Sequence, residues 1–241
     1  MALRRLTWRR PEWPWVLFVA GAWLVLAWEG TRPVVQAMHH SMTGMSMGSG
    51  GHHELSGSGL GWWMLMAAAM MLPASLPLLR EISLQSIWRR RYRSSALFLA
   101  GYLALWTLFG VAALATWHAV TVVAPSTPAA LVTGAMFIVA AAWGLTATKR
   151  RCLKRCHRYL PLPPRGRAAD VACLHFGLYN GRQCVAVCWP LMLATVPSHT
   201  LAPMLGATAL VSWERLARLP RLRVCAFVLA VTGALVVYVA A

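Results

Sequence analysis

The chain consists of long apolar segments separated by shorter segments that carry most of its charged residues. Hydrophobic residues make up 59% of its 241 residues and charged residues 12%, and its mean hydropathy is +0.56. This composition is typical of integral membrane proteins rather than of water-soluble domains. A helix needs about 20 mostly apolar residues to cross a bilayer. Seven segments approach that requirement, namely 14–28, 60–79, 96–120, 129–148, 171–196, 201–211 and 224–240.

These segments predict an all-α fold, a polytopic integral membrane helical bundle with about seven transmembrane helices. The segment 201–211 is the weakest of them because Pro197 and Pro203 interrupt its start, so a six-helix bundle is the alternative. We expect a single membrane domain, residues 1–241, with a Met/His-rich outer loop at 30–59 and a basic inner loop at 149–169.

Lysine and arginine are concentrated on one side of the predicted membrane. Of the 23 such residues, all but Arg32 and Arg182 lie before the first span or within 80–93, 149–167 and 215–223. With seven spans these segments share one face, which the positive-inside rule makes the cytoplasmic face. The N-terminus is then cytoplasmic and the C-terminus lies outside. Because the net charge of +17 resides in short segments beside the membrane, we expect the lipid bilayer as a partner and no nucleic acid.

The outer loop carries a run of methionine and histidine that an ordinary fold does not need. Its candidate metal ligands are Met38, His39, His40, Met42, Met45, Met47, His52 and His53. Thioether and imidazole groups are soft to borderline ligands that suit copper, and the thioethers favour Cu(I), whereas imidazole also suits zinc and nickel. The alternative interpretation is a flexible Gly/Ser linker in which these residues are incidental.

Two predicted spans carry further sulfur ligands at helical spacing. Met66 and Met70 are four residues apart and share a helix face, and Cys184, Cys188 and Met192 form a second stripe at the same spacing. If the two faces meet, they offer a soft metal site inside the bundle. The alternative is packing, because methionine and buried cysteine also fill apolar cores.

Cys152 and Cys156 form a second thiol pair in the basic inner loop. They share a face if this segment is helical. Neighbouring cations lower the pKa of a thiol and favour the thiolate, which serves metal binding or redox exchange. A solvated basic segment that happens to contain two cysteines is the alternative.

Several of these residues together resemble a bacterial domain-of-unknown-function family described as predicted metal-binding integral membrane proteins. The resemblance covers about residues 61–218 and rests on Met70, Met71, Leu72, Pro73, Pro77, Gly144, Leu145, Lys149, Cys152, Cys156, Gly177, Gly181, Cys184, Cys188, Trp189, Leu191, Met192 and Glu214. Val187 stands where that family often has another cysteine. The resemblance implies metal handling in a bacterial inner membrane, similar to that of a copper chaperone, and makes the loop 30–59 periplasmic.

The sequence as a whole predicts copper binding and handling as a chaperone, transfer or assembly factor for a membrane or periplasmic copper protein. No catalytic motif is present and the chain has only six carboxylates, so we do not expect an enzyme. A membrane thiol-disulfide oxidoreductase using Cys184 and Cys188 is the first alternative, although two cysteines one helical turn apart are poorly placed to form a disulfide. A non-catalytic subunit of a larger membrane complex is the second.

Overall fold

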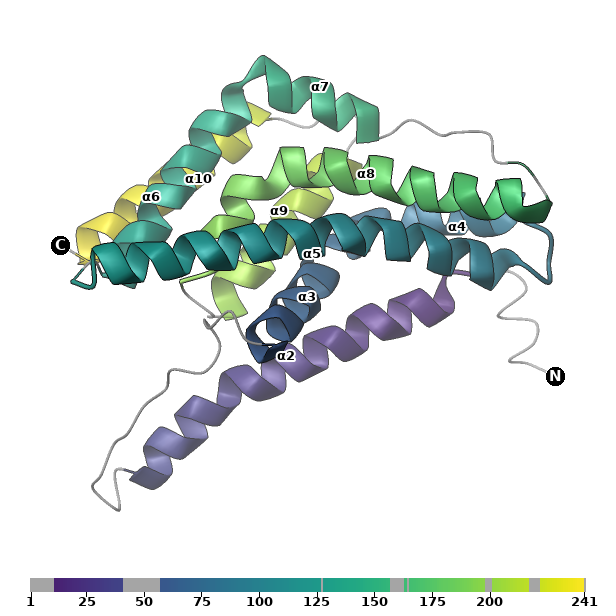
Figure 1. Ribbon diagram of the computed structural model, residues 1–241. Helices are drawn as coiled ribbons and strands as arrows, with labels where there is room; N and C mark the ends of the chain where they lie inside the picture. Colours follow the sequence, from purple (N-terminus) through teal and green to yellow (C-terminus); the bar gives the residue numbers. More distant parts are fainter. Residues whose placement is uncertain are drawn as a thin grey trace.

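The described part of the chain is built from helices and contains no strand (Figure 1). The computed structural model describes residues 11–40, 57–126, 128–156, 163, 165–197, 201–216 and 222–240. The helices are α2 (Trp13–His40), α3 (Gly57–Met71), the 3₁₀ turn η1 (Pro73–Ser75), α4 (Leu76–Gln85), α5 (Arg91–Val123), α6 (Ala129–Leu145), α7 (Ala147–Cys156), α8 (Gly166–Ala194), α9 (Leu201–Leu216) and α10 (Leu222–Ala240). The predicted all-α fold is confirmed.

Two of the described helices are long and apolar enough to cross a membrane, namely α5 and most of α10. Two bent helix pairs raise this number to four if each pair forms one span. Residues 59–71 and 73–85 meet at 50°, where Pro73 and Pro77 interrupt the helical hydrogen bonds, and α6 meets α7 at 78°, where the backbone of Thr146 is extended.

Helices α5 and α8 run side by side in the same direction and form the centre of the fold (Figure 1). Glycine makes their close approach feasible. A methyl group on Gly177 would collide with the backbone carbonyl of Phe98, and one on Gly101 would collide with that of Leu174. Small residues allow helix backbones to approach in this way. The approach brings Tyr102 of α5 next to the middle of α8.

Indole N–H groups connect the other helices to this centre. Trp63 of α3 donates a hydrogen bond to the backbone oxygen of Trp106 in α5, at 2.9 Å. Trp143 of α6 donates to the backbone oxygen of Ala186 in α8, at 3.0 Å. α6 packs along α10. The hydroxyl of Tyr102 in α5 lies 3.5 Å from the backbone oxygen of Met71 and 3.0 Å from Sγ of Cys184, so the methionine-containing end of α3 and the middle of α8 lie against the same stretch of α5.

Helix α7 folds back over α8 after the bend at Thr146 (Figure 1). Lys149, Leu153 and Cys156 recur at helical spacing and are buried, whereas the residues between them are mostly exposed and basic. The first part of the predicted inner loop is therefore an amphipathic helix with one face against the bundle, because burying Leu153 and Cys156 removes apolar surface from water.

The predicted loop 30–59 is helical at both of its ends. The backbone of α2 continues through His40, so Met38, His39 and His40 belong to its last turn, and α3 begins at Gly57. The side chains of these three residues are outside the described part of the structure, and Met42, Met45, Met47, His52 and His53 lie outside it altogether.

Candidate metal centre

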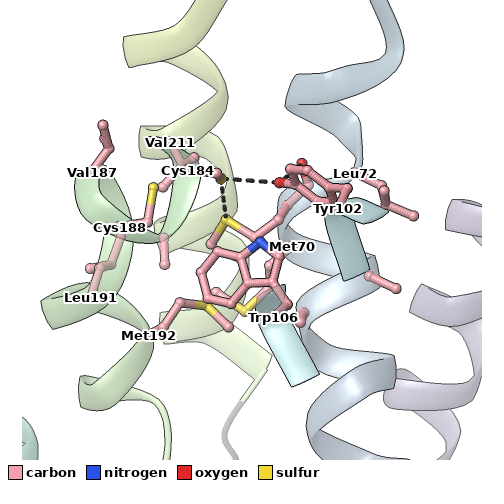
Figure 2. Close-up of a cluster of buried hydrophobic side chains, with 14 of the residues drawn as sticks. Met70, Leu72, Tyr102, Trp106, Cys184, Val187, Cys188, Leu191, Met192 and Val211 are labelled. Carbon is pink, nitrogen blue, oxygen red and sulfur yellow. Dashed lines mark hydrogen bonds between the residues drawn. The ribbon is translucent and has the colours of Figure 1, made fainter. Parts of the chain in front are cut away.

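The structure places the predicted sulfur residues of α3 and α8 in one buried cluster. Met66, Met70, Cys184, Cys188 and Met192 are each 2% exposed or less and belong to the same hydrophobic core. Figure 2 shows Met70, Cys184, Cys188 and Met192 around the indole ring of Trp106. The thioethers come from one helix and the thiols from another, so the fold is what brings them together.

Cys184 is at the centre of the cluster, where several side chains contact its sulfur atom. The hydroxyl of Tyr102 donates a hydrogen bond to its Sγ atom at 3.0 Å (Figure 2). This Sγ lies 4.0 Å from Sδ of Met71. Arg215 Nη1 donates to the same sulfur at 3.4 Å. Cys188 follows one turn later, with its thiol beside that of Cys184. Two thiols and a thioether sulfur thus meet in a site closed to solvent.

Met71 is a sulfur residue of the cluster that helical spacing does not indicate. Met66 and Met70 share a helix face, but residues 66–72 are all buried, so every face of this stretch contacts protein. Spacing cannot single out one face of a helix that is buried all round. The signal that could have indicated Met71 is its position directly after Met70, at the end of α3 and next to the break at Pro73.

The thioethers of Met66 and Met192 extend the cluster toward the end of α8. The hydroxyl of Thr195 donates a hydrogen bond to the backbone oxygen of Met192 at 2.7 Å, and the hydroxyl oxygen lies 3.7 Å from Sδ of Met66. Both methionines are therefore close to the last turn of α8. The sulfur atoms form a buried series that runs from this turn to Cys184.

Polar side chains give the cluster a positive environment. The guanidinium of Arg215 donates through Nη2 to Asn180 Oδ1 at 3.2 Å, as well as to Cys184. Both side chains are almost fully buried. Arg215 belongs to the basic segment 215–223 of the sequence, and charge counting did not indicate that it is buried. It is buried because α9 extends to Leu216, which places Arg215 in its last turn next to Asn180 and Cys184 of α8.

A second charged pair lies next to the cluster. Lys149 Nζ of α7 is 2.9 Å from Oε1 of Glu214 in α9, and the two side chains are 6% and 2% exposed. Lys149 is the first residue of the predicted basic inner loop, and its place in the sequence did not indicate burial. It is buried because α7 folds back over the bundle. A narrow cavity links this ion pair with Cys188 and Leu191.

Cys152 and Cys156 differ in their surroundings. Cys156 faces the bundle and is buried, whereas Cys152 is partly exposed. Burial raises the pKa of the Cys156 thiol from its ordinary value of 9.0 to about 12, although the charge of Arg215 acts in the opposite direction. The expectation that basic neighbours would lower this pKa is therefore wrong for Cys156, because the loss of hydration outweighs the nearby cations.

The candidate metal ligands of the cluster are the sulfur atoms of its cysteines and methionines. Among the described residues, no group of three or more His, Cys, Asp or Glu side chains is assembled in a way that could hold a metal ion. All six cysteines are free thiols. Thiolate and thioether ligands select soft ions such as Cu(I), whereas zinc in structural sites takes four thiolate or imidazole ligands.

Comparison with known proteins supports copper handling, as the sulfur ligands of the cluster do. The sequence model of the PpoB2 family, described as a copper chaperone, matches residues 60–238, which include the whole sulfur cluster. No curated protein and no solved structure matches the chain. The family description indicates copper handling together with copper proteins, in a non-enzymatic role. The chain thus belongs to the PpoB2 family of copper chaperones.

Proposed function

We propose that this chaperone resides in the bacterial inner membrane, holds one Cu(I) ion between α3 and α8, and passes it to a membrane or periplasmic copper protein. The observation that carries the proposal is the meeting of Cys184, Cys188 and Met71 in a site without water access. A low-coordinate sulfur site of this kind suits Cu(I) and offers little to hard ions.

The surface of the helices supports a membrane location. Large apolar side chains are exposed along α5 and α10, among them Leu108, Val122, Phe227 and Leu235. Apolar residues on such a scale are stable at a surface only when lipid or protein covers them. The proposed seven spans are α2, α3 with α4, α5, α6, α8, α9 and α10. In this arrangement α7 lies at the membrane surface.

The positions of the helix ends support the proposed topology. Arg90 and Arg93 at the start of α5 contact Asp170 near the start of α8, the latter pair at 2.8 Å, so two basic segments lie at the same end of the bundle. The end of α5 and the start of α6 lie at the opposite end (Figure 1). The positive-inside rule makes the basic end cytoplasmic, with the N-terminus inside and the C-terminus outside.

The sulfur series suggests a path for the ion. In this proposal, the Met/His-rich loop 30–59 collects copper on the periplasmic side, and Met66 and Met192 are the next donors. Cys184 and Cys188, with Met71, are the final holding site. Thioethers bind Cu(I) without losing a proton and thiolates provide the charged ligands, so each step exchanges one soft donor for another.

A competition titration of Cu(I) on the purified full chain tests the proposal. A chromophoric Cu(I) chelator reports the number and affinity of bound ions in the absence of oxygen. We expect Cys184→Ser with Cys188→Ser to remove one tightly bound ion. Cys225→Ser, at a buried cysteine of α10 outside the cluster, serves as the matched control and should leave binding unchanged.

A second variant distinguishes copper binding by the loop from copper binding by the cluster. Replacing Met42, Met45 and Met47 by alanine should leave the ion at Cys184 and Cys188 in place. Circular dichroism of each variant shows that the helices are retained. Undiminished Cu(I) binding in the folded double-serine variant would overturn the proposal.

A further inference from the structure

Arg215 is unusual among the basic residues that the structure describes because its guanidinium contacts a proposed copper ligand. Its Nη1 atom lies 3.4 Å from Cys184 Sγ, and its Nη2 atom donates to Asn180 Oδ1. The side chain is 4% exposed. Arginine stays protonated at any physiological pH, so the site contains a fixed positive charge. The nearby carboxylate of Glu214 is bound by Lys149.

The charge of the loaded site depends on the ion. A monovalent ion that binds the thiols of Cys184 and Cys188 releases two protons to water and forms a dithiolate complex of charge −1. A divalent ion forms a complex of charge zero by the same exchange. In a buried site an uncompensated charge is costly, whereas an opposite charge in contact stabilises it.

We propose that Arg215 is a positioning residue that makes this site selective for monovalent over divalent soft ions. Its charge neutralises the complex of Cu(I) with two thiolates. With a divalent ion the complex is already neutral, so the arginine charge contributes much less to binding. This inference rests on the proposed function, because it takes Cys184 and Cys188 as the ligands.

The size of the effect follows from the contact distance. Two unit charges about 4 Å apart, at an effective dielectric constant of about 20, change an equilibrium constant by about a thousandfold. Relaxation of the protein and entry of water reduce this value. We therefore expect removal of the arginine charge to weaken Cu(I) binding by at least about tenfold, and to change Cd²⁺ binding much less.

The test compares Cu(I) with Cd²⁺ on the full chain in detergent. Arg215→Met removes the charge and keeps an apolar side chain of similar length, and Arg215→Lys keeps the charge. Arg91→Met is the matched control, because Arg91 is also buried, at 5% exposed, but lies over the ring of Trp88 instead of a sulfur atom. Dissociation constants are measured by competition with a chelator for each ion.

We expect Arg215→Met to lower the preference for Cu(I) over Cd²⁺ by at least about tenfold, and Arg215→Lys and Arg91→Met to retain it. Equal weakening of both ions in Arg215→Met, or an unchanged preference, would overturn the inference. If Arg215→Met does not fold, Arg215→Gln takes its place in the comparison. Wild-type Cu(I) binding that persists in Cys184→Ser with Cys188→Ser would instead refute the proposed function, so the two failures are distinguishable.

Discussion

The ion pair between Lys149 and Glu214 provides a direct test of the packing of α7 on the bundle. The charged atoms are 2.9 Å apart and the side chains are 6% and 2% exposed. Removing one partner leaves the other as an unpaired buried charge, which costs about 3–5 kcal/mol. We expect Lys149→Met and Glu214→Leu each to lower the free energy of unfolding by this amount.

The double variant separates the charge effect from packing. Trp143, Leu210 and Leu229 surround the pair, so two apolar side chains can replace it. Replacing a buried ion pair by apolar residues is often neutral or stabilising. The combined variant should therefore be more stable than either single variant, which corresponds to a coupling energy of about 3 kcal/mol or more.

Chemical unfolding of the full chain in detergent, followed by circular dichroism, measures these differences. Arg80→Met is the control, because Arg80 is 3.9 Å from Glu12 and is 56% exposed. An exposed pair of this kind contributes at most about 1 kcal/mol. If the two single substitutions each cost less than the control, or if their costs simply add in the double variant, the buried ion pair does not hold α7 in place.

Two further predictions concern the helix contact and the inner thiols. Gly177→Ala should separate α5 from α8 and lower the free energy of unfolding by about 1–3 kcal/mol. The control is Gly206→Ala, which should be neutral or stabilising because the added methyl group meets no atom within 4 Å. Equal effects of the two substitutions would show that the fold does not need the close approach. Alkylation of the folded chain between pH 7 and 9, mapped by mass spectrometry, should spare Cys156, because a thiol of pKa about 12 remains protonated there. The partly exposed Cys152 should be modified. Rapid labelling of both cysteines would contradict the burial of Cys156.

Hydropathy and helical spacing predicted the helices and much of the cluster. Each apolar segment is helical in the structure, because a run of some 20 apolar residues has few other stable structures. The exceptions are in the bounds, since α2 continues to His40 and the segments 60–79 and 129–148 are broken at Pro73 and Thr146. The stripe of Cys184, Cys188 and Met192 lies on one face of α8 for the same geometric reason. Helical spacing alone does not show that this stripe faces α3, because that depends on how α3 and α8 both pack against α5.

The residues that the sequence analysis missed are those whose position depends on tertiary structure. Tyr102 reaches Cys184 because Gly101 and Gly177 allow α5 and α8 to approach, which no local pattern reveals. Lys149 and Arg215 were counted with the basic inner segments, but α7 and the end of α9 bury them. Charge counting predicts the side of the membrane for a segment and not the burial of one residue within it.

X-ray absorption at the copper edge tests the central claim most directly. The sample is the full chain loaded with Cu(I), in a variant whose loop methionines and histidines between residues 38 and 53 are replaced by serine. The account predicts a copper ion surrounded by sulfur alone, and loss of this ion when Cys184 and Cys188 are also replaced by serine. Nitrogen or oxygen ligands, or a sulfur signal that survives the loss of both cysteines, would contradict it.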